Sequence, residues 1–300
     1  MIKSEMDSRI IGPTSLNYLC YTKVNKELTF NNKKIYLWFD NHNLFYNKSG
    51  RDKRQIGIKK YIWKFVKLFN NPILYLEVPV NMDRLNIKGH KMSLYSIYEE
   101  SKLDENKSQI TDDESKLDNK IRLMYVDIRN QVNIGLLAEK LRHNYIIEET
   151  DLNDLNKLTK QDVSYFISEY EKYLKYIFKD FKNNELLDTI ITICILELVK
   201  NNKINETIIK KLNSITVNDV NTKKTENPII YIEPIVGIIM DISIILRISI
   251  NNNENQIFYG GDAHSDMITV VLTRLGFKCK QLNTMTIKNV SQFVSENGEC

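Results

Sequence analysis

One short phrase occurs twice in this chain: a strand-like apolar run that ends in an aspartate and a histidine. The first copy covers residues 35–42 (IYLWFDNH), and the second covers residues 256–264 (QIFYGGDAH). Two of the four histidines in the chain therefore follow an aspartate at the end of a predicted strand. In open α/β sheets ligands bind at this end, because the strands hold the exit loops rigidly. The repeat therefore predicts a site where the two strands end.

Strand-like runs alternate with helical patterns at both ends of the chain. Besides the repeated phrase, strands are predicted over 73–78, 121–128 and 277–282, and helices over 56–70, 131–144, 234–249 and 265–275. This alternation predicts an α/β fold: a mainly parallel sheet with flanking helices and an all-helical insertion. Residues 1–33 are predicted to be an irregular lead-in.

The length of the chain is sufficient for a sizeable core. With 300 residues and 42% apolar content, we expect a single α/β domain over 1–300. Its core is predicted to cover 34–149 plus 228–285. Residues 150–216 are almost wholly helical in pattern and form the helical insertion. Residues 99–120 are acidic and free of aromatics, which predicts a solvated insertion outside the sheet.

The net charge and the cysteines indicate which partners and which cellular compartment to expect. The net charge is only +4, and the abundant lysines fit a coding sequence rich in A and T, so a nucleic-acid partner is not expected. The four cysteines are scattered and include no CxxC motif, which favours buried free thiols over disulfides. The charged start, residues 1–7, lacks the apolar core of a secretory signal. We therefore expect an intracellular protein that is not secreted.

Residues 229–250 are long and apolar enough to span a bilayer. Glu233, Asp241 and Arg247 interrupt this run, and Pro234 lies near its start. A charged group at bilayer depth costs several kcal/mol, so we expect a helix buried inside the protein rather than a membrane partner.

Polar residues lie at or near the ends of four strand-like runs. They are Asp40 and His42 in the first run, Glu77 in the second, Asp127 and Arg129 in the third, and Asp262 and His264 in the fourth. A buried carboxylate requires a cation, a metal or a histidine, so Glu77 and Asp127 are expected to have such a partner. They could instead form structural ion pairs with Arg129 or Arg84. Their shared position at strand exits favours one functional cleft.

The phrases YGGDAHS, ILYLEVP and MYVDIR and the helix MDISIILR resemble an uncharacterised protein family of large DNA viruses, which has paired FGDxH and GGDAHS motifs. The paired G-x-x-H motifs with a glutamate between them are more remotely similar to the Tiki/TraB/pheromone-shutdown group of metalloproteases and to the erythromycin esterases. The resemblance extends through short motifs over residues 34–275. It implies an intracellular viral protein, located in the host cytoplasm or the virion.

This resemblance also implies roles for individual residues. The catalytic candidates are His42, Glu77, Asp127, Arg129 and His264. The candidate ligands of a divalent metal, should the site hold one, are Asp40, His42, Glu77, Asp262 and His264. Gly261, Asp241 and Arg247 match further motif positions and are expected to support the site. The first copy departs from the family pattern, because Phe39 stands where the motif has glycine. If that glycine is needed for close backbone approach, Phe39 alters or abolishes activity.

Two functions of different classes follow. The first is a hydrolase acting on a small molecule or a peptide, in which a divalent metal or a histidine base activates water. In the metal-free version, Glu77 orients the histidine and Arg129 stabilises negative charge. The second is a non-catalytic viral protein on a degraded enzyme scaffold, either virion-associated or bound to a host protein. HExxH is absent, so the common zinc template does not apply.

Overall fold

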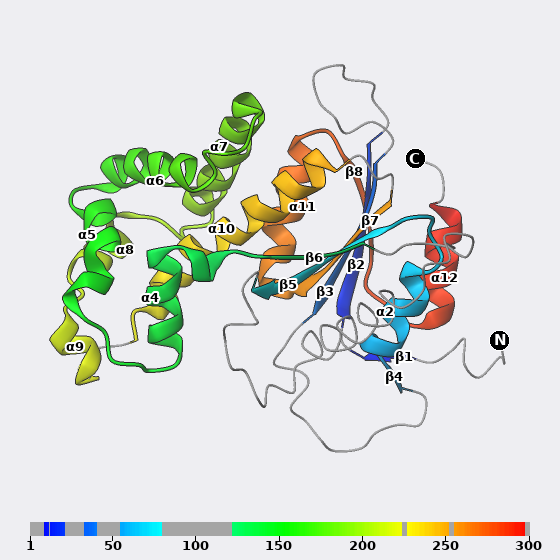
Figure 1. Cartoon of the computed structure of the whole chain (residues 1–300), viewed down its shortest axis with the longest axis horizontal. Helices are drawn as coiled ribbons and strands as arrows, with labels where there is room; N and C mark the ends of the chain where they lie inside the picture. The colour runs from blue at the N-terminus through cyan, green and yellow to red at the C-terminus, as the bar shows by residue number, and fades with distance from the viewer. Residues whose placement is uncertain are drawn as a thin grey trace, which may run out of the picture. The chain divides into compact units, whose positions relative to one another are not determined.

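The computed structural model describes residues 9–11, 13–21, 33–40, 55–79, 122–223, 227–251 and 255–297 (Figure 1). The chain divides into two compact units. The sheet unit comprises 1–126 and 247–300, and the helical unit comprises 127–246. The helical unit extends beyond the predicted insertion at both ends. The predicted α/β class is confirmed, with a mixed sheet, flanking helices and a long helical stretch.

The sheet has six strands in the order β6-β5-β7-β3-β2-β8. Their bounds are β2 Pro13–Cys20, β3 Lys34–Asp40, β5 Ile73–Pro79, β6 Arg122–Asp127, β7 Asn255–Gly261 and β8 Lys278–Leu282. The short strands β1 (Arg9–Ile11) and β4 (Gln55–Gly57) form a separate parallel pair. β7 lies between β3 and β5 and is parallel to both, whereas β2 is antiparallel to β3 and β8. Three neighbouring strands, β5, β7 and β3, therefore end at the same edge.

The two copies of the repeated phrase lie side by side in this sheet. β3 and β7 pair in parallel, with Trp38 opposite Tyr259 and Asp40 opposite Gly261. β5 adds the third strand, with Leu76 opposite Tyr259. Both strands of the repeat are buried from their second residue to their last, which explains why they read as continuous apolar runs.

Helices cover both faces of the sheet. α2 (Ile58–Val66) and α12 (Ile287–Glu296) pack on one face, where Trp38 and Tyr259 join their apolar side chains in one cluster (Figure 1). α11 (Ser265–Arg274) lies on the other face, where Asn17 donates to Thr269 at 3.0 Å. α11 ends as predicted before Gly276, which has a φ of 102° and serves as the helix terminator.

The helical unit contains most of the helices in the described part of the chain. They are α4 Asn133–Arg142, α5 Asn153–Thr159, α6 Val163–Ile177, α7 Asn184–Lys200, α8 Glu206–Asn213, α9 Val217–Asn221 and the larger part of α10 Ile229–Ile250. Side-chain caps begin several of them: for example, Asp162 accepts from Tyr165 N, and Asn205 accepts from Ile208 N. Tyr170 is fully buried between these helices, and its hydroxyl donates to the carbonyl of Ile235.

α10 is the one helix among the described residues that is long and apolar enough to cross a membrane. Of its most apolar window, 67% is buried inside the protein, as in the core helix of a folded domain. Asp241 is only 4% exposed, and neither Asp241 nor Arg247 lacks an interaction partner. The helix begins at Ile229, so Pro234 lies inside it, whereas the sequence predicted a start near 234.

Two expectations are wrong. Residues 1–33 are not wholly an irregular lead-in, because β2 is an interior strand of the sheet; its alternation was obscured by Pro13 and by polar Ser15 and Asn17. Cys20 is disulfide-bonded, whereas Cys194 and Cys279 are free thiols. A sequence without a CxxC motif does not exclude a disulfide between distant cysteines, because folding decides which residues meet. The insertion at 99–120 and the histidine at 42 lie outside the described residues.

Candidate functional site

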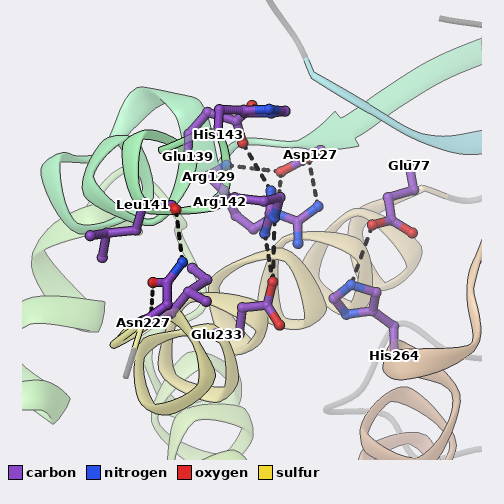
Figure 2. Close-up of polar contacts among 11 residues, drawn as sticks. Glu77, Asp127, Arg129, Glu139, Leu141, Arg142, His143, Asn227, Glu233 and His264 are labelled. Atoms are coloured by element: carbon purple, nitrogen blue, oxygen red, sulfur yellow. Dashed lines mark hydrogen bonds and ion pairs between the residues drawn. The ribbon is translucent and has the colours of Figure 1, made fainter. Parts of the chain in front are cut away.

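A buried carboxylate–imidazole pair lies at the edge where the parallel strands end. Glu77 Oε1 is 3.3 Å from His264 Nε2, and the side chains of Glu77 and His264 are only 10% and 7% exposed. The other carboxylate oxygen of Glu77, Oε2, accepts the backbone N–H of Gly261 at 2.6 Å. Figure 2 shows Glu77 and His264 pointing toward each other, one from the strand β5 and the other from the start of α11. The sequence predicted both residues and their placement at strand exits.

The local sequence explains why the pair forms. β7 ends at Gly261, and a single 3-10 turn, Asp262–His264, leads directly into α11. This turn places His264 beside the end of β5, because β5 is the parallel neighbour of β7. The same register aligns Glu77 with Gly260, one position beyond the Leu76–Tyr259 pair. The carboxylate therefore lies against backbone that carries no side chain.

The contacts of Glu77 bear on the tautomer of His264. The backbone N–H of Gly261 donates to Oε2, and a hydrogen bond of this kind favours the charged form of a carboxylate. A charged carboxylate can only accept, so the Nε2–H tautomer of His264 is the one that could donate to Oε1, which lies 3.3 Å from Nε2. In neutral imidazole this leaves the lone pair on Nδ1. A carboxylate that orients a histidine in this way is the usual support of a general base.

Below this pair, a polar network joins the sheet to the end of α10. The hydroxyl of Tyr75 donates to Gln256 Oε1 at 2.7 Å, and Asn251 Nδ2 donates to the Tyr75 oxygen at 2.9 Å. Gln256 in turn donates to the carbonyl of Ile248 at 3.1 Å. Burial raises the pKa of Tyr75, so its hydroxyl stays protonated. Tyr75 and Glu77 lie on the same face of β5, and this network therefore supports the strand that carries Glu77.

A buried lysine also binds the end of α10. Lys33 is 1% exposed, and its ammonium group donates to the carbonyls of Ile248 and Ser249 at 2.9 and 2.7 Å. Burial lowers the pKa of Lys33 to about 8. No pattern in the sequence indicated this contact, because a lysine before an apolar strand normally lies in solvent.

Asp40 lies at the same edge but on the opposite face of the sheet. It is fully buried, and its Oδ2 accepts the hydroxyl of Tyr259 at 2.8 Å. Side chains alternate along β3, so Asp40 lies on the same face as Trp38 and Tyr259, which belong to the apolar cluster under α2 and α12. Glu77 lies on the other face. The predicted ligand set is therefore divided by the sheet.

Asp127 and Arg129, in the helical unit, bond to each other. Arg129 donates through Nε to Asp127 Oδ1 and through Nη2 to Asp127 Oδ2, both at 2.8 Å, and its backbone N–H donates to Oδ1 at 3.0 Å (Figure 2). This bidentate contact lies in the segment that connects β6 to α4. It corresponds to the structural ion pair that the sequence left open as an alternative.

The remaining predicted residues have these positions. Asp262 is half-buried at the start of the 3-10 turn, Gly261 is the donor to Glu77, and His42 lies outside the described residues. In the helical unit, burial raises the pKa of Tyr170 and of the Cys194 thiol, and the negative charge of Asp241 makes a smaller contribution in the same direction. The proximity of His42 to His264 stays a prediction.

A divalent metal does not fit the described residues alone. Glu77 and His264 offer suitable donor atoms, but they bond to each other, and Asp40 bonds to Tyr259 on the opposite face. Over the described ranges, no three His, Cys, Asp or Glu side chains are grouped closely enough to hold a metal ion. We therefore derive no step through a metal.

Comparison with known proteins adds no relative. No protein-family model, curated protein or solved structure matches this chain. The site must therefore be interpreted from its own chemistry.

Proposed function

We propose that this protein is a hydrolase in which His264, oriented by Glu77, activates water. One observation carries the proposal: a carboxylate–imidazole contact of 3.3 Å, with both side chains at least nine-tenths buried, at the exits of two neighbouring parallel strands. Such pairs are costly to bury unless both members are satisfied. Their position at the edge where α/β proteins bind ligands supports a catalytic role over a purely structural one.

The proposed reaction uses His264 as a general base and Glu77 as its positioning residue. Nδ1 of His264 accepts a proton from water as the water oxygen adds to an electrophilic carbonyl carbon. The resulting imidazolium faces the ionised Glu77, which stabilises its charge. The same proton then passes to the leaving group, which restores the neutral ring. General base catalysis of this kind accounts for rate factors of about 10² to 10⁴.

The substrate class that suits this chemistry is a carboxylic ester or amide, in a small molecule or a short peptide. The small exposed fractions of Glu77 and His264 favour a substrate that presents its carbonyl in a confined space rather than on a flat surface. Arg129 is not assigned the charge-stabilising role, because its guanidinium is held by Asp127.

The test compares the parent with His264→Gln and Glu77→Gln on chromogenic acyl esters, lactones and a fluorogenic peptide. We expect turnover by the parent on at least one probe, a loss of about 100-fold or more in His264→Gln, and a smaller loss in Glu77→Gln. His143→Gln is the matched control and should retain parental turnover. The assay is repeated after chelation and after Zn²⁺ or Mn²⁺ is added back. Loss on chelation with recovery on metal would replace the histidine-base mechanism with a metal mechanism.

The alternative is a non-catalytic viral protein that binds a host protein or belongs to the virion. The observation that favours it is the first copy of the repeat, where Phe39 is fully buried and its ring packs 6.0 Å from that of Phe258. Only in the second copy do glycines, Gly260 and Gly261, let the backbone approach the Glu77 carboxylate. If the parent and His264→Gln hydrolyse every probe equally slowly, this alternative replaces the hydrolase.

A further inference from the structure

We propose that Gly260 is a positioning residue that acts on His264 through Glu77. The inference rests on the proposed function and deepens it by naming the feature that holds the Glu77 carboxylate in place. Three described groups meet at this point: the backbone of Gly260 and Gly261, the ring of Phe258, and the carboxylate of Glu77.

Gly260 is required for space rather than for backbone conformation. In the described residues, the only glycine with a positive φ is Gly276, and Gly260 lies in the regular strand β7. Any residue could therefore adopt its backbone angles. A Cβ atom at position 260, however, would lie 2.3 Å from Phe258 Cζ, 2.7 Å from Phe258 Cε1 and 3.1 Å from Glu77 Oε2. The first two distances are far inside van der Waals contact.

The ring of Phe258 is packed against another buried ring. Phe258 is fully buried, and its ring packs edge-on against the buried ring of Phe39, with 6.0 Å between the ring centroids. A side chain at 260 would therefore push against a packed ring on one side and against the carboxylate on the other. The carboxylate is the group at the edge of the strand, and we infer that it would move.

Movement of the carboxylate would be transmitted to the imidazole. Glu77 Oε2 is fixed by the Gly261 N–H at 2.6 Å, and this contact directs Oε1 to His264 Nε2 at 3.3 Å. The two oxygens belong to one rigid group, so displacing Oε2 also changes the contact of Oε1. The bare backbone at 260 therefore sets the position and the tautomer of the proposed base.

The experiment uses full-length protein with ¹⁵N-labelled histidine and three variants: Gly260→Ala, Phe258→Leu and the double variant that combines these two substitutions. Leucine lacks both ring atoms that the new methyl group would meet, so the double variant relieves the clash with the ring and keeps the contact with Glu77. It also provides a folded variant if Gly260→Ala alone does not fold. Long-range ¹H–¹⁵N correlations identify the tautomer of His264, with signals assigned from His264→Gln.

We expect a single Nε2–H tautomer with a slowly exchanging ring N–H in the parent and in Phe258→Leu. Both variants that carry the Gly260→Ala substitution should lose this signature, and the turnover found for the parent should fall on the order of 100-fold. Parental His264 signals in the double variant would overturn the proposal, because Gly260 would then serve only the packing of Phe258. If the parent hydrolyses no probe, the proposed function fails, but the tautomer comparison still decides the role of Gly260.

Discussion

Two histidine–glutamate pairs among the described residues have the same atoms in contact but different surroundings (Figure 2). In the helical unit, His143 Nε2 lies 2.9 Å from Glu139 Oε1, one turn apart on α4, and the two side chains are 39% and 50% exposed. In the sheet unit, His264 and Glu77 come from segments far apart in the sequence, lie 3.3 Å apart, and are almost wholly buried. The exposed pair has the shorter contact.

From this comparison we expect contact distance to be a poor guide to what each ion pair contributes to stability. Water competes for both members of the exposed pair, and such i, i+4 pairs contribute only a few tenths of a kcal/mol. In the buried pair, each lost contact leaves a polar group without solvent to replace it. The backbone N–H of Gly261 further fixes Glu77, whereas Glu139 contacts only the exposed side chains of Arg142 and His143 in the described contacts.

The largest expected difference is in stability after each glutamate is removed. Glu77→Ala should lower the free energy of unfolding by about 3 kcal/mol, because it strands His264 and the Gly261 N–H in a buried site. Glu139→Ala should lower it by less than about 0.5 kcal/mol. Urea denaturation at neutral pH measures both. Equal effects would show that burial does not distinguish the two pairs.

The pH dependence of stability tests the contrast between buried and exposed charged groups on two lysines, Lys33 and Lys172. The pKa of buried Lys33 is lowered to about 8 from the ordinary 10.5, so between these values the unfolded chain binds a proton that the folded chain has lost. The free energy of unfolding should therefore rise with pH, by about 2 kcal/mol between pH 8 and pH 10. Denaturation should show this slope in the parent and not in Lys33→Met. Exposed Lys172, bonded to Glu169 at 2.7 Å, is the control, and Lys172→Met should keep the slope. A parent with flat stability over this range would contradict the buried placement of Lys33.

A smaller loss of unfolding free energy is expected when the polar network around Tyr75 is disrupted. Tyr75→Phe removes the hydroxyl that bonds Gln256 and Asn251 and should cost about 1 to 2 kcal/mol in thermal or chemical unfolding. Tyr176→Phe, at a tyrosine that is 68% exposed, is the matched control and should have no measurable effect. If Tyr75→Phe is also neutral, the network does not support β5.

The smallest effect is expected at the exposed histidine. His143→Gln should change the free energy of unfolding by less than about 0.5 kcal/mol and leave any hydrolysis unchanged. A loss of activity in this variant would move the candidate site from the sheet unit to the helical unit.

The strand exits could be predicted from the sequence because polar residues lie at or near the ends of apolar, strand-like runs. Glu77 lies near the end of one apolar run that predicts a buried strand, His264 follows another, and parallel strands bring their exits to one edge. Sequence could not show that Asp40 lies on the opposite face from Glu77, because the register between β3, β5 and β7 decides it. By motif alignment Asp40 corresponds to Asp262, but the strand pairing places it opposite Gly261.

Other features could not be predicted because they depend on long-range packing. Asp127 and Arg129 resemble site residues in the sequence, and only the folded turn shows that they bond each other. The role of Gly260 depends on the ring of Phe258 and on a carboxylate from another strand. The burial of Lys33 depends on where α10 ends.

¹⁵N NMR at neutral pH can test directly whether Glu77 orients His264, by measuring the tautomer of His264 in the parent and in Glu77→Gln. We expect a single Nε2–H tautomer with a slowly exchanging ring proton in the parent. In Glu77→Gln this signature should be lost, whereas the signals of His143 should be the same in both proteins. A parent in which His264 exchanges freely between tautomers, or a Glu77→Gln variant that retains the parental signal, would contradict the claim that Glu77 orients His264 as a base.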